Sequence, residues 1–293
     1  MFFKENVKKI FIGIILGFSI IIPGLSGSAI AISLILYDEI IHSVSTIIKD
    51  FKKSFMFLFP FIIGGVTGLL IGVLAVKIIL KYYPFYVICF FSGLMIGTFP
   101  IITKQINFNK KNRFNIILLI IGTLIPVILS LLSLYLNINN KISFNVIDYI
   151  IYIVIGICLA ITQLVPGLSA TVFLIVIGYY NNLLSIVDVY LLLDYRKLFI
   201  IICIIIGLII GILLFSKIIN NTLKYKKNEF MHLVCGLSFS SILCVFIEEN
   251  CLKIYKTFNS SNIIINLLIG SISLVLGILI TTIIFDKGEK NEK

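Results

Sequence analysis

Two short segments of this chain combine proline, glycine and hydroxyl residues within long apolar runs. The first extends from Pro23 to Ser28 and reads Pro-Gly-Leu-Ser-Gly-Ser, and the second extends from Pro166 to Thr171 and reads Pro-Gly-Leu-Ser-Ala-Thr. A Pro-Gly pair interrupts a helix, and a serine after it is a good N-cap for another. Each segment therefore predicts a break between two half-helices, where unpaired backbone N–H groups and hydroxyls can bind phosphate or carboxylate oxygens.

The candidate anion-binding residues at the two breaks are those that leave backbone groups accessible and those that carry hydroxyls. They are Pro23, Gly24, Ser26, Gly27 and Ser28 at the first break, and Pro166, Gly167, Ser169 and Thr171 at the second. Gln163, just before the second break, serves either helix packing or ligand contact. One Pro-Gly kink is often purely structural, but two matched breaks with matched hydroxyls favour a substrate or ion site.

Two carboxylates follow the first broken run. Asp38 and Glu39 are charged, whereas the matching positions of the second run are Asn181 and Asn182. The carboxylates are either a solvated cap or a coupling site for H⁺ or Na⁺. The sequence has no metal-ligand spacing, nucleotide-binding loop or catalytic dyad, so we expect no cofactor, no metal and no enzymatic activity.

Membrane helices must position these residues. With 60% hydrophobic and 13% charged residues, the composition predicts an all-α polytopic membrane protein. Besides the broken runs at residues 10–41 and 149–184, we expect six spans. They lie at residues 54–76, 84–103, 114–136, 198–216, 230–247 and 263–285. The net charge of +11 arises from lysines and arginines in short loops, which orient the chain in the bilayer, so no nucleic-acid partner is expected.

The chain also contains an internal duplication. When the sequence is aligned with itself at an offset of 143 residues, rare residue types match over a long stretch without a gap. A small change of the offset then aligns Gly122 with Gly270. The matched pairs include Gly13 with Gly156, Pro23 with Pro166, Tyr37 with Tyr180, Gly64 with Gly207, and Gly93 with Gly236. Two repeats are therefore expected, at residues 1–143 and 144–293, each with one broken run and three spans.

Length and charge both predict that the broken runs are re-entrant hairpins. The 32 residues of 10–41 would make about 48 Å of helix, too long for one upright span and too short for two. Re-entrant runs place 17 of the 24 lysines and arginines on the cytoplasmic side, compared with 13 if both runs crossed fully. The positive-inside rule therefore favours inverted-topology repeats with both termini in the cytoplasm.

Inverted hairpins would bring the two breaks toward each other from opposite faces. In each hairpin the second limb begins at the break, so both limbs present the positive ends of their helix dipoles near the membrane centre. Glycine backbone and serine or threonine hydroxyls can then hold an anion there without a buried cation.

The two copies of Pro-Gly-Leu-Ser, each followed by an apolar limb that ends in tyrosine, resemble the PopT-type polyprenyl-phosphate translocases, formerly a membrane family of unknown function. The resemblance covers nearly the whole chain. It implies a flippase that returns undecaprenyl phosphate from the outer to the inner leaflet of the bacterial cytoplasmic membrane for cell-wall synthesis. The residues it places at the phosphate are Pro23, Gly24, Ser26 and Gly27, with Pro166, Gly167 and Ser169.

This chain departs from the family pattern at three points. Gly27-Ser28-Ala29 stands where the family has Gly-Gly-Thr, Ile35 replaces a glycine, and Ala170 replaces another. Ser28 and Thr171 are expected to supply the lost donors. Two other functions use the same features: an ion channel or small-anion carrier with a dipole-lined centre, and a membrane scaffold that transports nothing.

Overall fold

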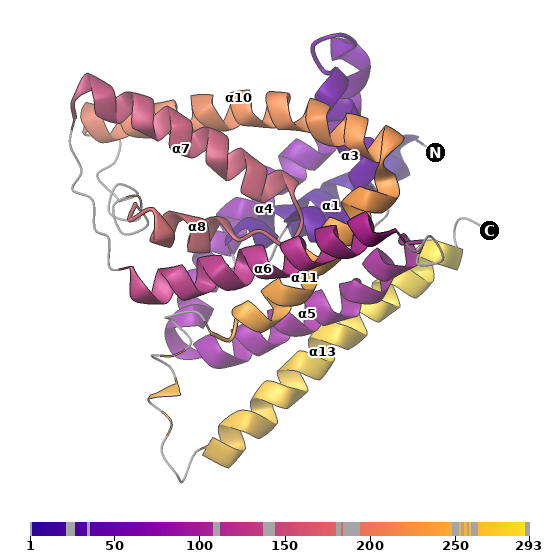
Figure 1. The fold of residues 1–293 in the computed structure, drawn as a ribbon, viewed down its shortest axis with the longest axis vertical. Helices are drawn as coiled ribbons and strands as arrows, with labels where there is room; N and C mark the ends of the chain where they lie inside the picture. Colours follow the sequence, from indigo (N-terminus) through magenta and orange to yellow (C-terminus); the bar gives the residue numbers. More distant parts are fainter. Residues whose placement is uncertain are drawn as a thin grey trace.

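The computed structural model is helical through the membrane-crossing part of the chain (Figure 1). It describes residues 2–21, 27–33, 36–107, 112–136, 144–179, 183, 194–247, 252, 255–256, 258 and 263–290. The helices of the first half are α1 (Phe2–Ile21), α2 (Gly27–Ser33), α3 (Tyr37–Thr46), α4 (Phe51–Tyr82), α5 (Pro84–Lys104) and α6 (Arg113–Tyr135). Those of the second half are α7 (Val146–Leu164), α8 (Ala170–Val176), α10 (Tyr195–Tyr225), α11 (Lys227–Cys244) and α13 (Ile263–Lys290).

Six described helices are long and apolar enough to cross a membrane, which confirms the predicted class of all-α polytopic membrane protein. They are α4, α5, α6, α7, α10 and α13. Every predicted span overlaps a helix, although α4 and α10 extend to 32 and 31 residues. They are longer than predicted because lysine ends an apolar stretch without ending a helix.

Two helices differ from the sequence-based expectation. The span expected at 230–247 is α11, which is not among the six candidate spans because it carries lysine, histidine and several serines. α7 is among the six: its 19 residues rise about 28 Å, and it forms the first limb of the second broken run. The helix after the second break, α8, has only seven residues. The second broken run thus has a long first limb and a short second helix.

Each half contains the same close pair of helices. α1 packs along α4, and α7 packs along α10. A Cβ atom added to Gly13 would lie 3.0 Å from the Cα of Gly64, and one added to Gly156 would lie 3.0 Å from the Cα of Gly207. These glycines therefore let the helices touch backbone to backbone. Residues that the 143-residue offset aligns make the same contact in both halves.

The helices of each pair run in the same direction. Gly13 of α1 meets Gly64 of α4, and Gly17 further along α1 meets Leu69 further along α4. The contacts between α7 and α10 follow the same order. Paired helices therefore begin at the same end of the molecule, so the chain between them returns to the end from which it came.

The end of the second broken run shows this return directly. The Tyr179 ring, three residues after α8, lies edge-on to the Tyr152 ring near the start of α7, with 5.9 Å between the ring centres. In Figure 1 α7 and α10 both begin at the left, whereas α1 begins and α13 ends at the right.

The remaining long helices pair across the two halves. α6 of the first half packs on α11 of the second, and α13 of the second packs on α5 of the first. Gly122 meets Gly236 in one pair, and Gly277 meets Gly93 in the other. By this contact the counterpart of Gly122 is Gly277. The sequence alignment with Gly270 was wrong, because that glycine lies against the Phe85 ring instead.

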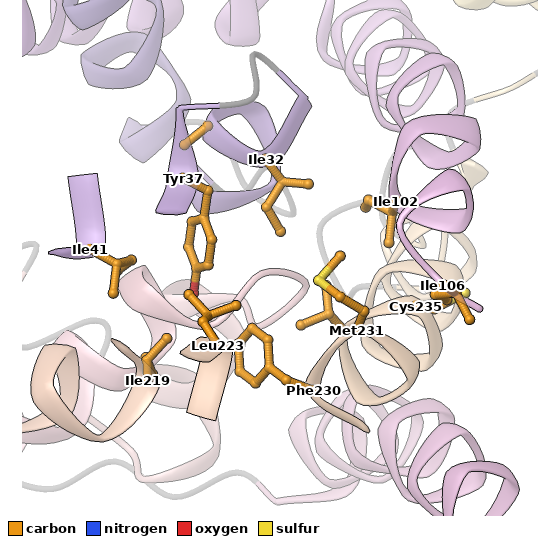
Figure 2. Close-up of a cluster of buried hydrophobic side chains, with 12 residues drawn as sticks. Ile32, Tyr37, Ile41, Ile102, Ile106, Ile219, Leu223, Phe230, Met231 and Cys235 are labelled. Carbon is orange, nitrogen blue, oxygen red and sulfur yellow. The ribbon is translucent and has the colours of Figure 1, made fainter. Parts of the chain in front are cut away.

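A cluster of buried side chains joins the halves at the end of the molecule where α1 begins. It contains Ile32, Tyr37 and Ile41 after the first break, Ile102 of α5, Ile219 of α10, and Phe230 and Met231 of α11 (Figure 2). Leu164 and Val165, at the second break, pack against the same cluster. The cluster therefore links the first broken run to the residues immediately before the second break.

Candidate functional site

The second break has the local geometry that its sequence predicts. α7 ends at Leu164, Val165 after it is extended, and Gly167 follows with a φ of +88°. Ser169 is extended and caps α8, its hydroxyl oxygen accepting a 3.4 Å hydrogen bond from the Val172 N–H. Because the hydroxyl acts there as an acceptor, its proton remains able to donate to an anion.

Gly167 lies directly against the backbone of α11. A Cβ atom at this position would lie 2.6 Å from the Leu237 carbonyl carbon and 2.7 Å from the Ser238 nitrogen. The positive φ and the close approach each require glycine. Since Leu237 lies ten residues into α11, the break packs against the interior of that helix, well away from its start.

A hydrogen bond fixes the break to α11. The Ser241 hydroxyl donates to the Gly167 carbonyl oxygen, and it lies 2.7 Å from the Leu237 carbonyl oxygen in its own helix. Ser238, one turn earlier, is 4% exposed, and its hydroxyl has no hydrogen-bond partner in the described part of the chain. Sequence reasoning missed both serines. Their signal was a run of three hydroxyls, Ser238, Ser240 and Ser241, inside an expected span.

The space beside the second break is small. A cavity of about 20 Å³ is lined by Ser130 of α6, Gly167 and Ser169 of the break, and Ser241 of α11. This volume holds about one water molecule. In this conformation the break therefore has polar groups in place but no room for a phosphate group.

The first break is described only where its second helix begins. Pro23, Gly24 and Ser26 lie outside the described residues, while Gly27 starts α2 and Ser28 is 6% exposed. α2 contacts α7, the helix that leads to the second break.

Two further candidates lie beside the second break. Gln163 is half-buried in the last turn of α7. Thr171 lies in the first turn of α8, and its side chain is outside the described part.

Tyr37 ties the first broken run to the second break. Its hydroxyl donates a 2.8 Å hydrogen bond to the carbonyl oxygen of Leu164, the last residue of α7. Its ring stacks on Phe230 of α11, with 6.4 Å between the ring centres and 13° between the planes. The sequence suggested a tyrosine at the end of each limb but could not show that this one contacts the opposite half.

The two carboxylates after Tyr37 have different surroundings. Asp38 forms a salt bridge with Lys227, the first residue of α11, and both side chains are about half exposed. Glu39 is exposed on the surface of α3. Within the described residues, no three His, Cys, Asp or Glu side chains are grouped so that they could hold a metal ion.

Comparison with known proteins gives two matches over most of the chain. A sequence model of a family described as undecaprenyl phosphate translocase-like matches residues 16–263. The polyprenyl-phosphate transporter of Staphylococcus aureus (strain NCTC 8325 / PS 47) is 30% identical over 246 residues, which cover 82% of this chain and 85% of the relative. No solved structure matches the chain.

Proposed function

This chain belongs to the undecaprenyl phosphate translocase-like family, and from that membership we propose that it moves a polyprenyl phosphate across the membrane. The observation that carries the proposal is the family match over residues 16–263, which includes both Pro-Gly-Leu-Ser breaks. The similarity to a protein named polyprenyl-phosphate transporter supports the same substrate class.

The proposed substrate is undecaprenyl phosphate, and the proposed direction is from the outer to the inner leaflet of the bacterial cytoplasmic membrane. This direction returns the lipid carrier to cell-wall synthesis. Transfer of its long tail through water would cost about 0.8 kcal/mol per methylene group, so we expect the tail to remain in lipid while the phosphate alone passes through protein. No chemical step is needed, and we expect the protein not to be an enzyme.

The proposed path for the phosphate runs along the two breaks. The parallel pairs α1–α4 and α7–α10 support re-entrant runs, because each pair begins at one end of the molecule. We propose that the two halves are inverted repeats with both termini in the cytoplasm. Ser169 and the first N–H groups of α8 would bind the phosphate from one side, and Ser26 with Ser28 from the other.

The proposal requires the second break to move. Its cavity of about 20 Å³ has to enlarge before a phosphate can enter, and the hydrogen bond between Ser241 and Gly167 lies on its wall. We propose that alternating access enlarges this space when the broken runs shift against α11. Asp38 and Glu39 remain the candidate sites for a coupling ion, H⁺ or Na⁺.

The test is translocation of a labelled undecaprenyl phosphate in proteoliposomes. The double variant Ser26→Ala with Ser169→Ala should abolish translocation while the protein remains folded, because both breaks lose a donor. Ser271→Ala is the matched control: Ser271 is an exposed serine of α13 whose hydroxyl bonds to Leu268 of the same helix. Full activity of the double variant would refute the proposed site.

The same liposomes distinguish the other two functions. Uptake of phosphate or chloride, with no movement of the lipid, would identify a channel or small-anion carrier. A wild-type protein that moves neither lipid nor ions would favour a scaffold.

A further inference from the structure

A second cavity lies between the two halves, at the end of the molecule where α1 begins. Its volume is about 330 Å³, and it is bounded by α2 and α3, the end of α5 and the start of α11. Its polar lining consists of Tyr37, Asp38, Lys104, Gln105 and Lys227. At about 30 Å³ per water molecule, this cavity has room for a phosphate group with several waters, which the cavity at the second break lacks.

The cavity lies where a lipid headgroup would lie. Lys104 is the last residue of a candidate membrane span, Phe85–Lys104, and Lys227 is the first residue of α11. Ile32 and Ile101 are the apolar residues of the described lining. The cavity therefore combines lysines at the end of a candidate membrane span with apolar lining residues, and both features suit an amphiphilic anion.

The charges in the cavity can accept an anion. Two lysines, Lys104 and Lys227, are among the described lining residues, and their ammonium groups and the Gln105 amide are hydrogen-bond donors that an anion can accept from. The side chains of Lys227 and Asp38 are 45% and 49% exposed, so their salt bridge contributes little to stability and can exchange readily. An ammonium group has three donors, so a phosphate could join or replace the carboxylate at Lys227.

These charges are confined to one of two equivalent places in the duplicated fold. The 143-residue offset aligns Asp38 with Asn181, Lys104 with Ile247, and Lys227 with Pro84. The helix frame is common to both halves, yet none of the three charged residues is repeated. A difference of this kind is expected when the two faces of a transporter have different tasks.

We propose that this cavity binds a phosphate monoester, the headgroup of the transported lipid, on the side where α1 begins. The proposal rests on the translocase function proposed above. Lys104 and Lys227 hold the phosphate oxygens, and Gln105 donates its amide. Asp38 forms its salt bridge with Lys227 when the cavity is empty, and the phosphate replaces the Asp38 carboxylate at Lys227 when the cavity is filled.

The test is calorimetric titration of the full chain in detergent micelles with farnesyl phosphate, farnesol and inorganic phosphate. Lys104→Gln and Lys227→Gln should each weaken the binding of farnesyl phosphate about tenfold, through loss of a charge-assisted hydrogen bond. Asp38→Asn should tighten it about threefold, because Lys227 is released from its competitor. Lys224→Gln and Asp50→Asn are the matched controls and should leave the affinity unchanged: Lys224 lies over the Tyr225 ring, Asp50 is exposed, and neither residue lines the cavity.

The opposite signs of Lys227→Gln and Asp38→Asn are decisive. If the salt bridge only joins the two halves, both variants lower thermal stability and neither tightens binding, and the proposal is wrong. Inorganic phosphate should bind more weakly than farnesyl phosphate and compete with it. Equal affinity would assign the cavity to free phosphate, and tight binding of farnesol would assign it to the tail; either result overturns the proposal.

Translocation measured on the same variants separates the two proposals. If the wild-type protein moves undecaprenyl phosphate but the lysine variants bind farnesyl phosphate with unchanged affinity, the cavity assignment fails and the translocase function stands. If the wild-type protein neither moves the lipid nor binds farnesyl phosphate, both fail.

Discussion

α5 and α11 occupy matching places in the two halves, and their first residues differ completely. α5 begins Pro84-Phe85-Tyr86, and α11 begins Lys227-Asn228-Glu229 at the positions 143 residues later. At the start of α5, the Phe85 ring lies edge-on to the rings of Tyr255 and Phe258. At the start of α11, Lys227 meets Asp38 beside an open polar cavity.

The interiors of the same two helices differ in a similar way. The Thr98 hydroxyl of α5 donates a hydrogen bond to the Met95 carbonyl oxygen in the same helix. Its counterpart in α11, the Ser241 hydroxyl, donates to the Gly167 carbonyl oxygen at the second break. The glycines that pack the helices, Gly93 and Gly236, are common to both. The glycine packing contacts are thus alike in the two helices, whereas the partners of the polar groups differ.

The largest expected effect is at the contact between the second break and α11. Gly167→Ala should lower the free energy of unfolding by about 3 kcal/mol and abolish translocation, because it combines a positive φ with a clash against the helix backbone. Gly65→Ala is the control, since the nearest atom to its added Cβ is 3.9 Å away. Titration with SDS in micelles measures the stability of both variants. Equal stability would show that this contact does not constrain the break.

The shared frame should respond equally in the two halves. Gly93→Ala and Gly236→Ala should each cost about 2 kcal/mol of stability, because the added Cβ would lie 2.9 Å from the Leu274 carbonyl carbon in one case and 2.9 Å from the Thr123 nitrogen in the other. The same titration compares them. A loss confined to one helix would contradict structural equivalence of the pairs α5–α13 and α11–α6.

The hydroxyls should respond unequally. Ser241→Ala should cost about 1–2 kcal/mol, because it leaves the Gly167 carbonyl without that partner, and it should change the rate of translocation. Thr98→Val deletes a hydrogen bond within one helix, so we expect a smaller loss of stability and normal translocation. Rates in proteoliposomes and unfolding in micelles are the two measurements. Identical translocation rates for the two variants would show that the Ser241 hydroxyl does not affect the movement of the second break.

The smallest effect is expected at the aromatic end of α5. The Tyr86 hydroxyl donates a 2.6 Å hydrogen bond to the side-chain oxygen of Asn266, and Tyr86→Phe deletes it at a cost of about 0.5 kcal/mol. Farnesyl phosphate affinity should not change, since Tyr86 does not line the charged cavity. A marked loss of affinity would show that the aromatic end also contacts the lipid phosphate.

The fold was predictable to the extent that it follows from local pattern. Apolar length located the helices, because a chain in lipid must satisfy its backbone hydrogen bonds within each segment. The spacing of rare glycines located the packing surfaces, and Gly167 and Ser169 formed the predicted break and cap. The alignment of Gly122 with Gly270 failed because both lie in apolar sequence with few rare residues, and only the contact with Gly93 identified Gly277.

The candidate site was predictable only in part. The sequence predicted α11 only as one of six spans, but most of its residues are buried, and its Ser241 donates a hydrogen bond to the break. The half-exposed pair of Asp38 and Lys227 joins residues 189 positions apart, which no local pattern could bring together.

By itself, the sequence determined that this is a helical membrane protein with a capped break in its second half, and it predicted that the two halves are duplicates. Hydropathy, proline and glycine act on neighbouring residues, so their consequences can be read along the chain. Only the tertiary structure decided that the second break rests on α11, that Tyr37 reaches Leu164, and that three charged residues surround one cavity. These contacts depend on how helices pack across the two halves, and packing is set by the whole bundle.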